Sequence, residues 1–321
     1  MTTIGIFHMK GGVGKSALTV FLADFLSSLH EQRILVVDLD PQGSTSKALI
    51  PEATLEKAFK QGHSLTSLLW LACNGGVSKE QAAVCLLHRE SGGKPRKGSV
   101  PLGPLSVLAT NRDDWREFTE KINRLDRAER WKFLDVLKDS LAPLANDFDI
   151  VLIDFPGSEI AYWTTMGLRA TDRWLLPEIP DFLSVSDIES VVEQVQDAQK
   201  NSTHTILPLG TLLNICPNRS SSTYSKARAA LIRLQDLNAI PPLFSKEAEV
   251  LHRPEAMKAT DWGSEASKTL VARYGPATKP FHVGLRKLAK EVLDRLGKSS
   301  DKDKLSVVAN IRRKLRDYWR S

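Results

Sequence analysis

Glycine, lysine and serine cluster near the start of the chain, in the run Lys-Gly-Gly-Val-Gly-Lys-Ser at residues 10–16. Glycine has no Cβ, so successive backbone N–H groups in such a run can turn toward one anion. The ammonium of Lys15 can neutralise the β- and γ-phosphates of a nucleotide, and the Ser16 hydroxyl can ligate Mg²⁺. We therefore expect this phosphate loop, residues 10–16, to bind a nucleotide. The predicted contacts come from Gly11, Gly12, Val13, Gly14, Lys15, Ser16 and Ala17.

Three aspartates follow short apolar runs further along the chain. Asp38 and Asp40 come after the run at 34–37, and Asp154 follows the run at 150–153. Side chains alternate between the two faces of a strand, so Asp38 and Asp40 lie on the same side of a strand end. A buried parallel strand that ends in a carboxylate is typical of the edge of a sheet where ligands bind. The pattern predicts that these carboxylates lie beside the phosphate loop.

The phosphate loop departs from the general pattern at its beginning. That pattern has glycine at position 9, where this chain has Met9, and the chain has a second lysine, Lys10. This variant resembles the deviant Walker A signature of the ParA/MinD family of ATPases, which use ATP and Mg²⁺. The resemblance implies that Lys10 reaches across a two-fold interface to the phosphates held by a partner subunit. It implies an ATP-sandwiched homodimer with Lys10, Lys15 and Asp40 as catalytic residues.

The segment Asp-Leu-Asp-Pro-Gln-Gly-Ser at 38–44 is similar to a second motif of that family. The resemblance implies that Asp40 orients the attacking water, and that Asp38 and Asp154 support a Mg²⁺ ion ligated by Ser16. The family more often has Asp-x-Pro-Pro where this chain has Asp-Phe-Pro-Gly, so the details of a second switch stay open. The residues implied to sense the nucleotide are Pro41, Gln42 and Gly157.

Two further positions carry weaker signals. The family usually has Asn or Ser, then Gln, before the signature lysine, and this chain has His8 and Met9. For His8 we favour a strand-end histidine packed by its neighbours over a contact with the nucleotide. Asn214 lies where the family places a strand and base-contacting residues, so it is the expected adenine contact. The alternative for Asn214 is a polar strand-end residue that caps a loop.

These motifs need a sheet that gathers strand ends. Apolar runs alternate with helical patterns, which predicts an α/β fold: a doubly wound, mostly parallel sheet with helices on both faces. Apolar residues from Leu18 to Leu29 recur at three- and four-residue steps, which predicts a helix directly after the phosphate loop. Helices are also expected near 184–200 and 280–297. The expected strands are 3–8, 33–38, 105–109, 149–154, 173–177 and 206–215.

The 321 residues fit one doubly wound domain with additions. We expect an ATPase domain over 1–297, with an inserted helical subregion and loop at 55–104, and a basic amphipathic helix over the tail, 298–321. No apolar stretch approaches the about 20 residues of a membrane span. Three cysteines without a Cys-x-x-Cys pair predict reduced thiols in a cytoplasmic protein.

The formal net charge of +6 is gathered in clusters, and the tail alone has eight basic and three acidic side chains. Basic clusters on a chain whose charges otherwise nearly cancel predict a polyanionic partner, and DNA is the leading candidate. The ParA resemblance independently implies non-specific DNA binding. The tail also resembles the membrane-targeting tail of the MinD branch, so DNA, membrane and packing or partner contact stay open for it. The DNA-binding candidates are Lys226, Arg228, Arg233, Arg286, Lys287, Arg312 and Arg313.

The resemblance as a whole implies a ParA-type ATPase associated with the nucleoid. Its ATP-bound dimer would bind DNA and position a plasmid, a chromosome or a protein assembly. A ParB-like or other activating protein would then trigger an otherwise slow hydrolysis. The alternatives are a MinD-like ATPase at a membrane surface and, ranked lower, a metabolic ligase that shares the phosphate loop.

Overall fold

A single seven-stranded sheet forms the centre of the computed structural model. The structure describes residues 1–91, 100–157, 161–180, 187–200, 202, 204–217, 219–237, 239–253 and 269–297. The strand order is β3-β4-β2-β5-β1-β6-β7, and all neighbours are parallel except β3 and β4. The strands are β1 (Thr2–Ile6), β2 (Ile34–Asp38), β3 (Leu87–Arg89), β4 (Leu105–Leu108), β5 (Ile150–Asp154), β6 (Arg173–Glu178) and β7 (Leu207–Leu213).

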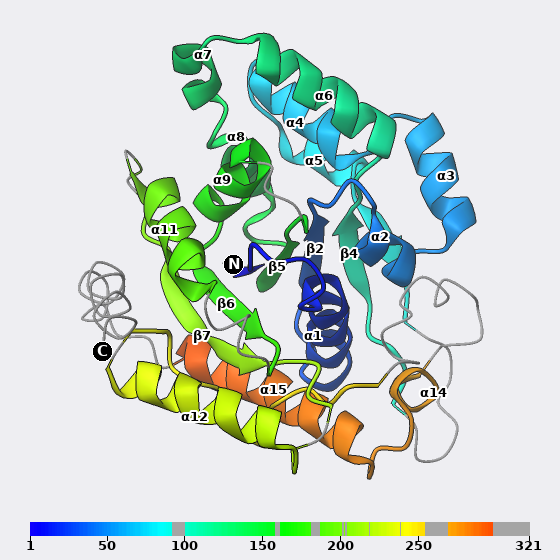
Figure 1. Cartoon of the computed structure of the whole chain (residues 1–321). Helices are drawn as coiled ribbons and strands as arrows, with labels where there is room; N and C mark the ends of the chain where they lie inside the picture. The colour runs from blue at the N-terminus through cyan, green and yellow to red at the C-terminus, as the bar shows by residue number, and fades with distance from the viewer. Residues whose placement is uncertain are drawn as a thin grey trace.

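Helices cover both faces of this sheet because its central strands are apolar on both sides. Along β2, Leu35 and Val37 join one hydrophobic cluster, whereas Ile34 and Val36 join the other. The second cluster contains α1 (Lys15–Leu29), α2 (Ser44–Leu49), α3 (Glu52–Lys60), α14 (Leu270–Tyr274) and α15 (Pro280–Gly297). The first contains α4 (Leu65–Cys73), α5 (Lys79–Val84), α6 (Arg112–Arg124), α8 (Val136–Leu141), α9 (Ala161–Arg169), α11 (Ile188–Gln199) and α12 (Ser222–Asp236). Figure 1 shows α1 beside α15, and α4 beside α6.

Strand register brings the predicted site residues to one edge of the sheet. Strand β5 lies between β1 and β2, with Asp154 opposite both Ile6 and Asp38. All three strands are parallel, so their carboxyl ends meet at this edge. The phosphate loop follows β1 and lies there too.

A buried ionic cluster ties α1 to its neighbours. Asp24 in α1 accepts hydrogen bonds from Arg89 of β3 and Arg273 of α14, each at 2.6 Å, and from the Tyr274 hydroxyl. Arg273 also donates to the Ala48 carbonyl in α2. Burial favours a raised Asp24 pKa, but the two guanidinium groups and the hydroxyl hold that pKa below its usual range. The cluster therefore fixes α1 and α2, which both begin at the site.

The doubly wound fold and its six expected strands are confirmed, with ends that differ by a few residues. The short β3 was not expected, because its sequence reads as the start of a basic loop. Helix α15 has the predicted bounds, and α11 begins at Ile188. The predicted tail helix lies outside the described residues, and the proposed domain division at residue 297 stays a prediction.

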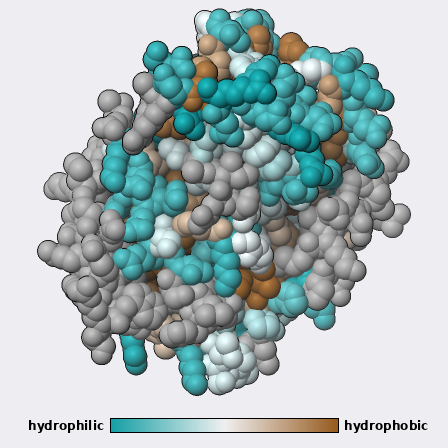
Figure 2. Space-filling view, turned by 45° about the horizontal axis from the view of Figure 1, so that its top comes forward, coloured by the Kyte–Doolittle hydropathy of each residue, from teal (hydrophilic) through white to brown (hydrophobic). Residues whose placement is uncertain are grey.

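The described surface is mostly polar. Figure 2 shows a face on which hydrophobic side chains form small separate patches. Among the described residues, the large hydrophobic side chains that are exposed are Met1, Leu71, Val84, Leu237 and Val283. None of the described helices is long and apolar enough to cross a membrane.

Candidate functional site

The phosphate loop leads from β1 into α1, and its backbone needs glycine at two positions. Gly12 and Gly14 have φ angles of 79° and 82°, in the left-handed region that side chains disfavour. Gly14 is also the N-cap of α1. A Cβ on Gly14 would lie 2.6 Å from Asn214 Nδ2, so this residue is also fixed by packing. The loop places the first N–H groups of a 15-residue helix at the site, where they favour an anion.

Lys15 is buried and folds back over the loop. Its Nζ donates to the Lys10 carbonyl at 3.1 Å. Burial lowers the pKa of Lys15, and the nearby carboxylates of Asp154 and Asp40 partly oppose this. A polyphosphate beside the ammonium would supply the negative charge that the buried group lacks.

Two fully buried carboxylates lie opposite each other at the ends of β2 and β5. Asp38 Oδ2 accepts from the Ser46 N–H at 2.8 Å and from the Ser46 hydroxyl at 2.7 Å. Asp154 Oδ2 accepts from the Thr45 hydroxyl at 2.6 Å. Burial raises the pKa of both carboxyl groups, and the Asp154 charge raises that of Asp38 further. The start of α2 is therefore bonded to both carboxylates.

Thr45 and Ser46 belong to the candidate site by their contacts, and the sequence analysis did not predict them. Both directly follow the recognised motif, and hydroxyl residues at the beginning of a helix ordinarily suggest capping. The only available signal was their position just beyond Asp38–Ser44. Their hydrogen bonds connect the start of α2 to Asp38 and Asp154, two of the residues predicted to hold Mg²⁺.

The donors present fit a Mg²⁺ ion. Ser16, Asp38 and Asp154 offer hard oxygen ligands, and Asp154 Oδ1 is buried with no hydrogen-bond partner among the described residues. In the described ranges, no group of three His, Cys, Asp or Glu side chains could hold a metal ion by itself. Mg²⁺ usually keeps several waters and takes one or two carboxylates plus substrate phosphates, so this modest set suits it.

Asp40 directly precedes the switch segment, residues 41–43, which lies between β2 and α2. Its Oδ1 accepts from the Gln42 N–H at 2.8 Å, while its own N–H donates to Asp38 Oδ1 at 3.2 Å. Gly43 has a φ of 63° and caps α2. The segment thus connects the carboxylate predicted to orient water with the carboxylate predicted to support Mg²⁺.

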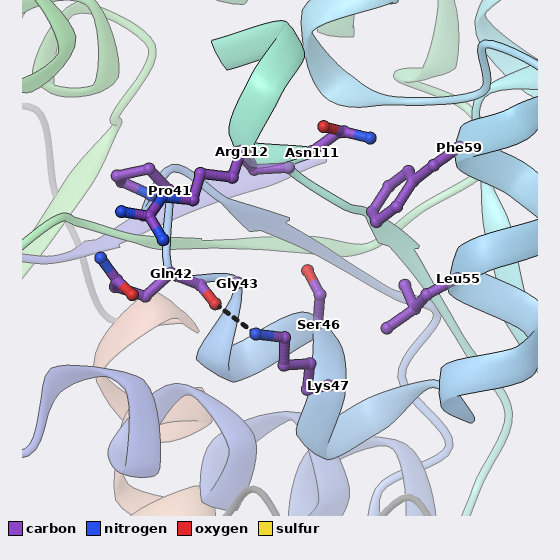
Figure 3. A pocket seen from close by; sticks show the side chains of 10 residues that line it. Pro41, Gln42, Gly43, Ser46, Lys47, Leu55, Phe59, Asn111 and Arg112 are labelled. Atoms are coloured by element: carbon purple, nitrogen blue, oxygen red, sulfur yellow. Dashed lines mark hydrogen bonds between the residues drawn. The ribbon is translucent and has the colours of Figure 1, made fainter. Parts of the chain in front are cut away.

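A cavity of about 200 Å³ flanks the switch segment, and none of the described residues that line it is acidic. Figure 3 shows Pro41 and Gln42 on one side of it, with Leu55 and Phe59 of α3 opposite. Lys47 Nζ donates to the Gln42 carbonyl at 2.9 Å from below. The cavity therefore leaves open space between the switch segment and α3.

Gly157 lies against the phosphate loop, and its role as a sensor of the γ-phosphate stays a prediction. A Cβ on Gly11 would come within 3.5 Å of the Gly157 carbonyl oxygen, so the two backbones approach closely. The neighbouring residues 158–160 lie outside the described part of the chain.

Asn214 has a different position from the one expected of an adenine contact. It is fully buried, and its Nδ2 donates to the Val13 carbonyl at 2.8 Å beneath the phosphate loop. Its amide donor is therefore occupied by the loop. This geometry favours the alternative of a polar strand-end residue that supports a loop, and the adenine contact stays a prediction.

The DNA-binding candidates separate into three groups. Lys226 and Arg233 on α12, and Arg286 and Lys287 on α15, are exposed. Arg228 instead pairs with the buried Glu249 at 2.9 Å, so it has a structural partner that the sequence did not show. Arg312 and Arg313 lie outside the described residues.

Comparison with known proteins places this geometry in a family. A model of the CobQ/CobB/MinD/ParA nucleotide binding domain matches residues 4–253. The chain is 27% identical over 218 residues to a chromosome partitioning protein ParA of Myxococcus xanthus, covering 68% of this chain. It spans 66% of that relative, slightly less than two thirds of its length.

Two solved structures share the fold at low identity. pNOB8 ParA bound to non-specific DNA has a TM-score of 0.68 and 18% identity, covering 93% of this chain and 99% of that one. A cobyrinic acid a,c-diamide synthase from Mycobacterium smegmatis, with bound ADP and magnesium, has a TM-score of 0.65 and 20% identity. That match covers 95% of this chain and 100% of the synthase chain.

Proposed function

The chain belongs to the CobQ/CobB/MinD/ParA nucleotide-binding family, and we propose that it is a Mg²⁺-dependent ATPase of the ParA type. In this proposal the ATP-bound form is a homodimer that binds DNA non-specifically and positions a cargo. The observation that carries the proposal is the combination of Lys10 and Lys15 on the phosphate loop with Asp38, Asp40 and Asp154 at the same sheet edge.

The proposed chemistry is in-line attack of water on the γ-phosphate. The loop N–H groups and Lys15 bind the phosphates, and Asp40 orients the attacking water. Ser16, Asp38 and Asp154 hold Mg²⁺, which supplies positive charge to the phosphate oxygens when bound. Lys10 acts in the partner's site, so hydrolysis requires the dimer. Turnover is slow until a partner protein stimulates it, because the useful product is a timed change of state.

DNA binding is proposed from charge and from relatives. The exposed cations on α12 and α15 provide phosphate contacts, and a dimer doubles their number. The Myxococcus relative is named a chromosome partitioning protein, and one structure with this fold is bound to non-specific DNA. Both support a ParA-type role on the nucleoid, with a ParB-like or other adaptor as activator.

A small-molecule ligase is the second candidate, because a cobyrinic acid a,c-diamide synthase shares the fold to a similar degree. The membrane alternative depends on the tail, which lies outside the described residues. The motif at 38–44 favours the ParA type over the ligase.

Co-sedimentation tests the proposal directly. The purified protein is spun with random-sequence DNA and, separately, with anionic liposomes, in ATP, in ADP and without nucleotide. We expect DNA binding that requires ATP and declines steeply with salt. Lys15→Ala is the control that should bind neither ATP nor DNA. ATP-dependent liposome binding without DNA binding would favour the membrane alternative, and binding to neither would favour a ligase.

A further inference from the structure

Two buried ionisable side chains beside the phosphate loop have no part in the proposed hydrolysis. His8 follows β1, Glu178 ends β6, and both side chains are 0% exposed. The two strands are parallel neighbours, with Ile6 opposite Leu175, so their carboxyl ends bring the pair together. His8 Nε2 lies 3.2 Å from Glu178 Oε1. Burying polar groups is costly, and an apolar pair would fill the same space, so packing alone does not account for this pair.

The other ring nitrogen of His8 bonds to the phosphate loop. The backbone N–H of Lys10 donates to His8 Nδ1 at 2.8 Å. A ring nitrogen that accepts a hydrogen bond carries no proton, so the ring proton lies on Nε2, facing Glu178. A carboxylate behind a histidine fixes its tautomer and orientation, as it does for metal-binding histidines. The Glu178 carboxylate therefore attracts the ring nitrogen that carries the proton, and this favours the ring orientation in which Nδ1 accepts the Lys10 N–H.

That N–H belongs to the signature lysine. Both backbone polar groups of Lys10 are bonded: its N–H donates to His8 Nδ1, and its carbonyl oxygen accepts from Lys15 Nζ at 3.1 Å. The direction in which a side chain leaves the backbone follows from the orientation of its peptide groups. Fixing the Lys10 N–H therefore restricts where the Lys10 ammonium can reach.

The Glu178 backbone is also linked to the loop indirectly, through Asn214. Its carbonyl accepts from the Asn214 N–H at 2.7 Å, and Asn214 Nδ2 donates to the Val13 carbonyl at 2.8 Å. The ends of β6 and β7 thus lie against the phosphate loop at two places, through His8 at Lys10 and through Asn214 at Val13.

We propose that His8, oriented by Glu178, is a positioning residue that directs Lys10 toward the nucleotide of a partner subunit. The consequence for Lys10 rests on the proposed ATP-bound dimer. The hold on the Lys10 backbone does not, because it exists in a single chain without nucleotide.

The first measurement is amide hydrogen exchange at Lys10 in the nucleotide-free protein. His8→Leu removes the acceptor, and we expect Lys10 exchange to become at least tenfold faster. His8→Asn supplies an amide oxygen that can accept from the same N–H, and it should restore most of the protection. Phe7→Leu is the matched control, because Phe7 is also buried at this strand end but packs on Phe155. Its Lys10 exchange should match that of the natural chain.

The second measurement is ATP-dependent dimerisation by analytical ultracentrifugation, with ATP affinity measured separately. His8→Leu should weaken dimerisation at least tenfold while ATP affinity changes less than threefold. His8→Asn should recover dimerisation, a rescue that a purely structural role would not produce. If His8→Leu fails to fold, Glu178→Met takes its place, since it leaves the acceptor but removes the group that orients it.

The outcomes separate this inference from the proposed function. Unchanged Lys10 exchange in folded His8→Leu would overturn the hold on the backbone. Faster exchange with normal dimerisation would overturn the role in directing Lys10. If the natural chain forms no dimer in ATP, the proposed function fails, and the exchange measurement still decides whether His8 holds Lys10.

Discussion

Asp40 differs from the other two aspartates of the site in its surroundings. Asp38 and Asp154 are fully buried and accept hydrogen bonds from the start of α2. Asp40 is half-buried, and within the described part of the chain its side chain accepts a hydrogen bond from the Gln42 N–H alone. A water-orienting group must reach substrate water, and a metal-supporting group must be held rigidly. The burial of the three carboxylates agrees with this division of roles.

Removing the Asp40 carboxylate should therefore separate binding from hydrolysis. We expect Asp40→Ala to bind ATP within about threefold of the natural affinity and to lose at least 100-fold in stimulated turnover, the usual scale for a general base. A fluorescent ATP analogue and a phosphate-release assay measure the two quantities. Unimpaired turnover would move the water-orienting role to another residue.

The buried carboxylate pair also predicts a pH effect on stability. Because burial raises the pKa of Asp38 and Asp154, the folded protein keeps protons that the unfolded chain has lost. The nucleotide-free protein should thus lose stability as the pH rises from the ordinary aspartate pKa of 3.8 toward the raised values. Asp38→Asn should make stability depend less on pH. At alkaline pH it should raise the melting temperature by about 2–4 °C. Thermal melts across pH measure it, and parallel curves for the two proteins would contradict it.

At the scale of elements, the position of α1 depends on charge as well as on apolar packing. Asp24 is fully buried, and α14 and β3 supply its cationic partners. Arg273 connects it to α2, which carries Thr45 and Ser46 toward the carboxylates. Neither helix can shift without disturbing this cluster.

Breaking the cluster should be far more damaging than breaking a surface pair. Arg273→Met leaves Asp24 with one guanidinium in a buried site, and we expect a loss of about 3–5 kcal/mol in unfolding free energy. The control is Arg33→Ala, which breaks the exposed pair with Asp149 and should change stability little. Urea denaturation of both variants provides the test. Equal losses of unfolding free energy would show that the buried cluster contributes no more to stability than an exposed pair.

At the scale of the whole molecule, the arrangement of exposed cations decides which surface can meet DNA. Lys226 and Arg233 are exposed on α12, but Arg228 on the same helix pairs with Glu249. Counting basic residues along the chain therefore overstates the surface that is free for phosphates.

Charge reversal can test that surface. We expect Lys226→Glu with Arg233→Glu to weaken ATP-dependent DNA binding by about tenfold and to reduce its salt dependence, because phosphate contacts are lost. Lys57→Glu with Lys60→Glu on α3 is a control with the same change of charge. Fluorescence anisotropy at several salt concentrations measures DNA binding by both double variants. Equal effects would indicate that net charge, rather than a contact surface on α12, determines DNA binding.

The sequence by itself determined the phosphate loop, the positions of the six main strands along the chain and the aspartates at strand ends. These features are local: glycine spacing, apolar runs and the residues that end them are readable within about ten positions. Parallel strands then force Asp38 and Asp154 to one edge, so their proximity also followed from the pattern.

Only the tertiary structure decided which side chains bond to one another across the fold. His8 and Glu178 are 170 residues apart in the sequence numbering, and Asn214 meets Val13 from 201 residues away. Helix α2 turns Thr45 and Ser46 onto the carboxylates, and Glu249 occupies Arg228. Such pairings depend on strand register and helix packing, which bring distant residues within hydrogen-bond distance, and no local pattern records them.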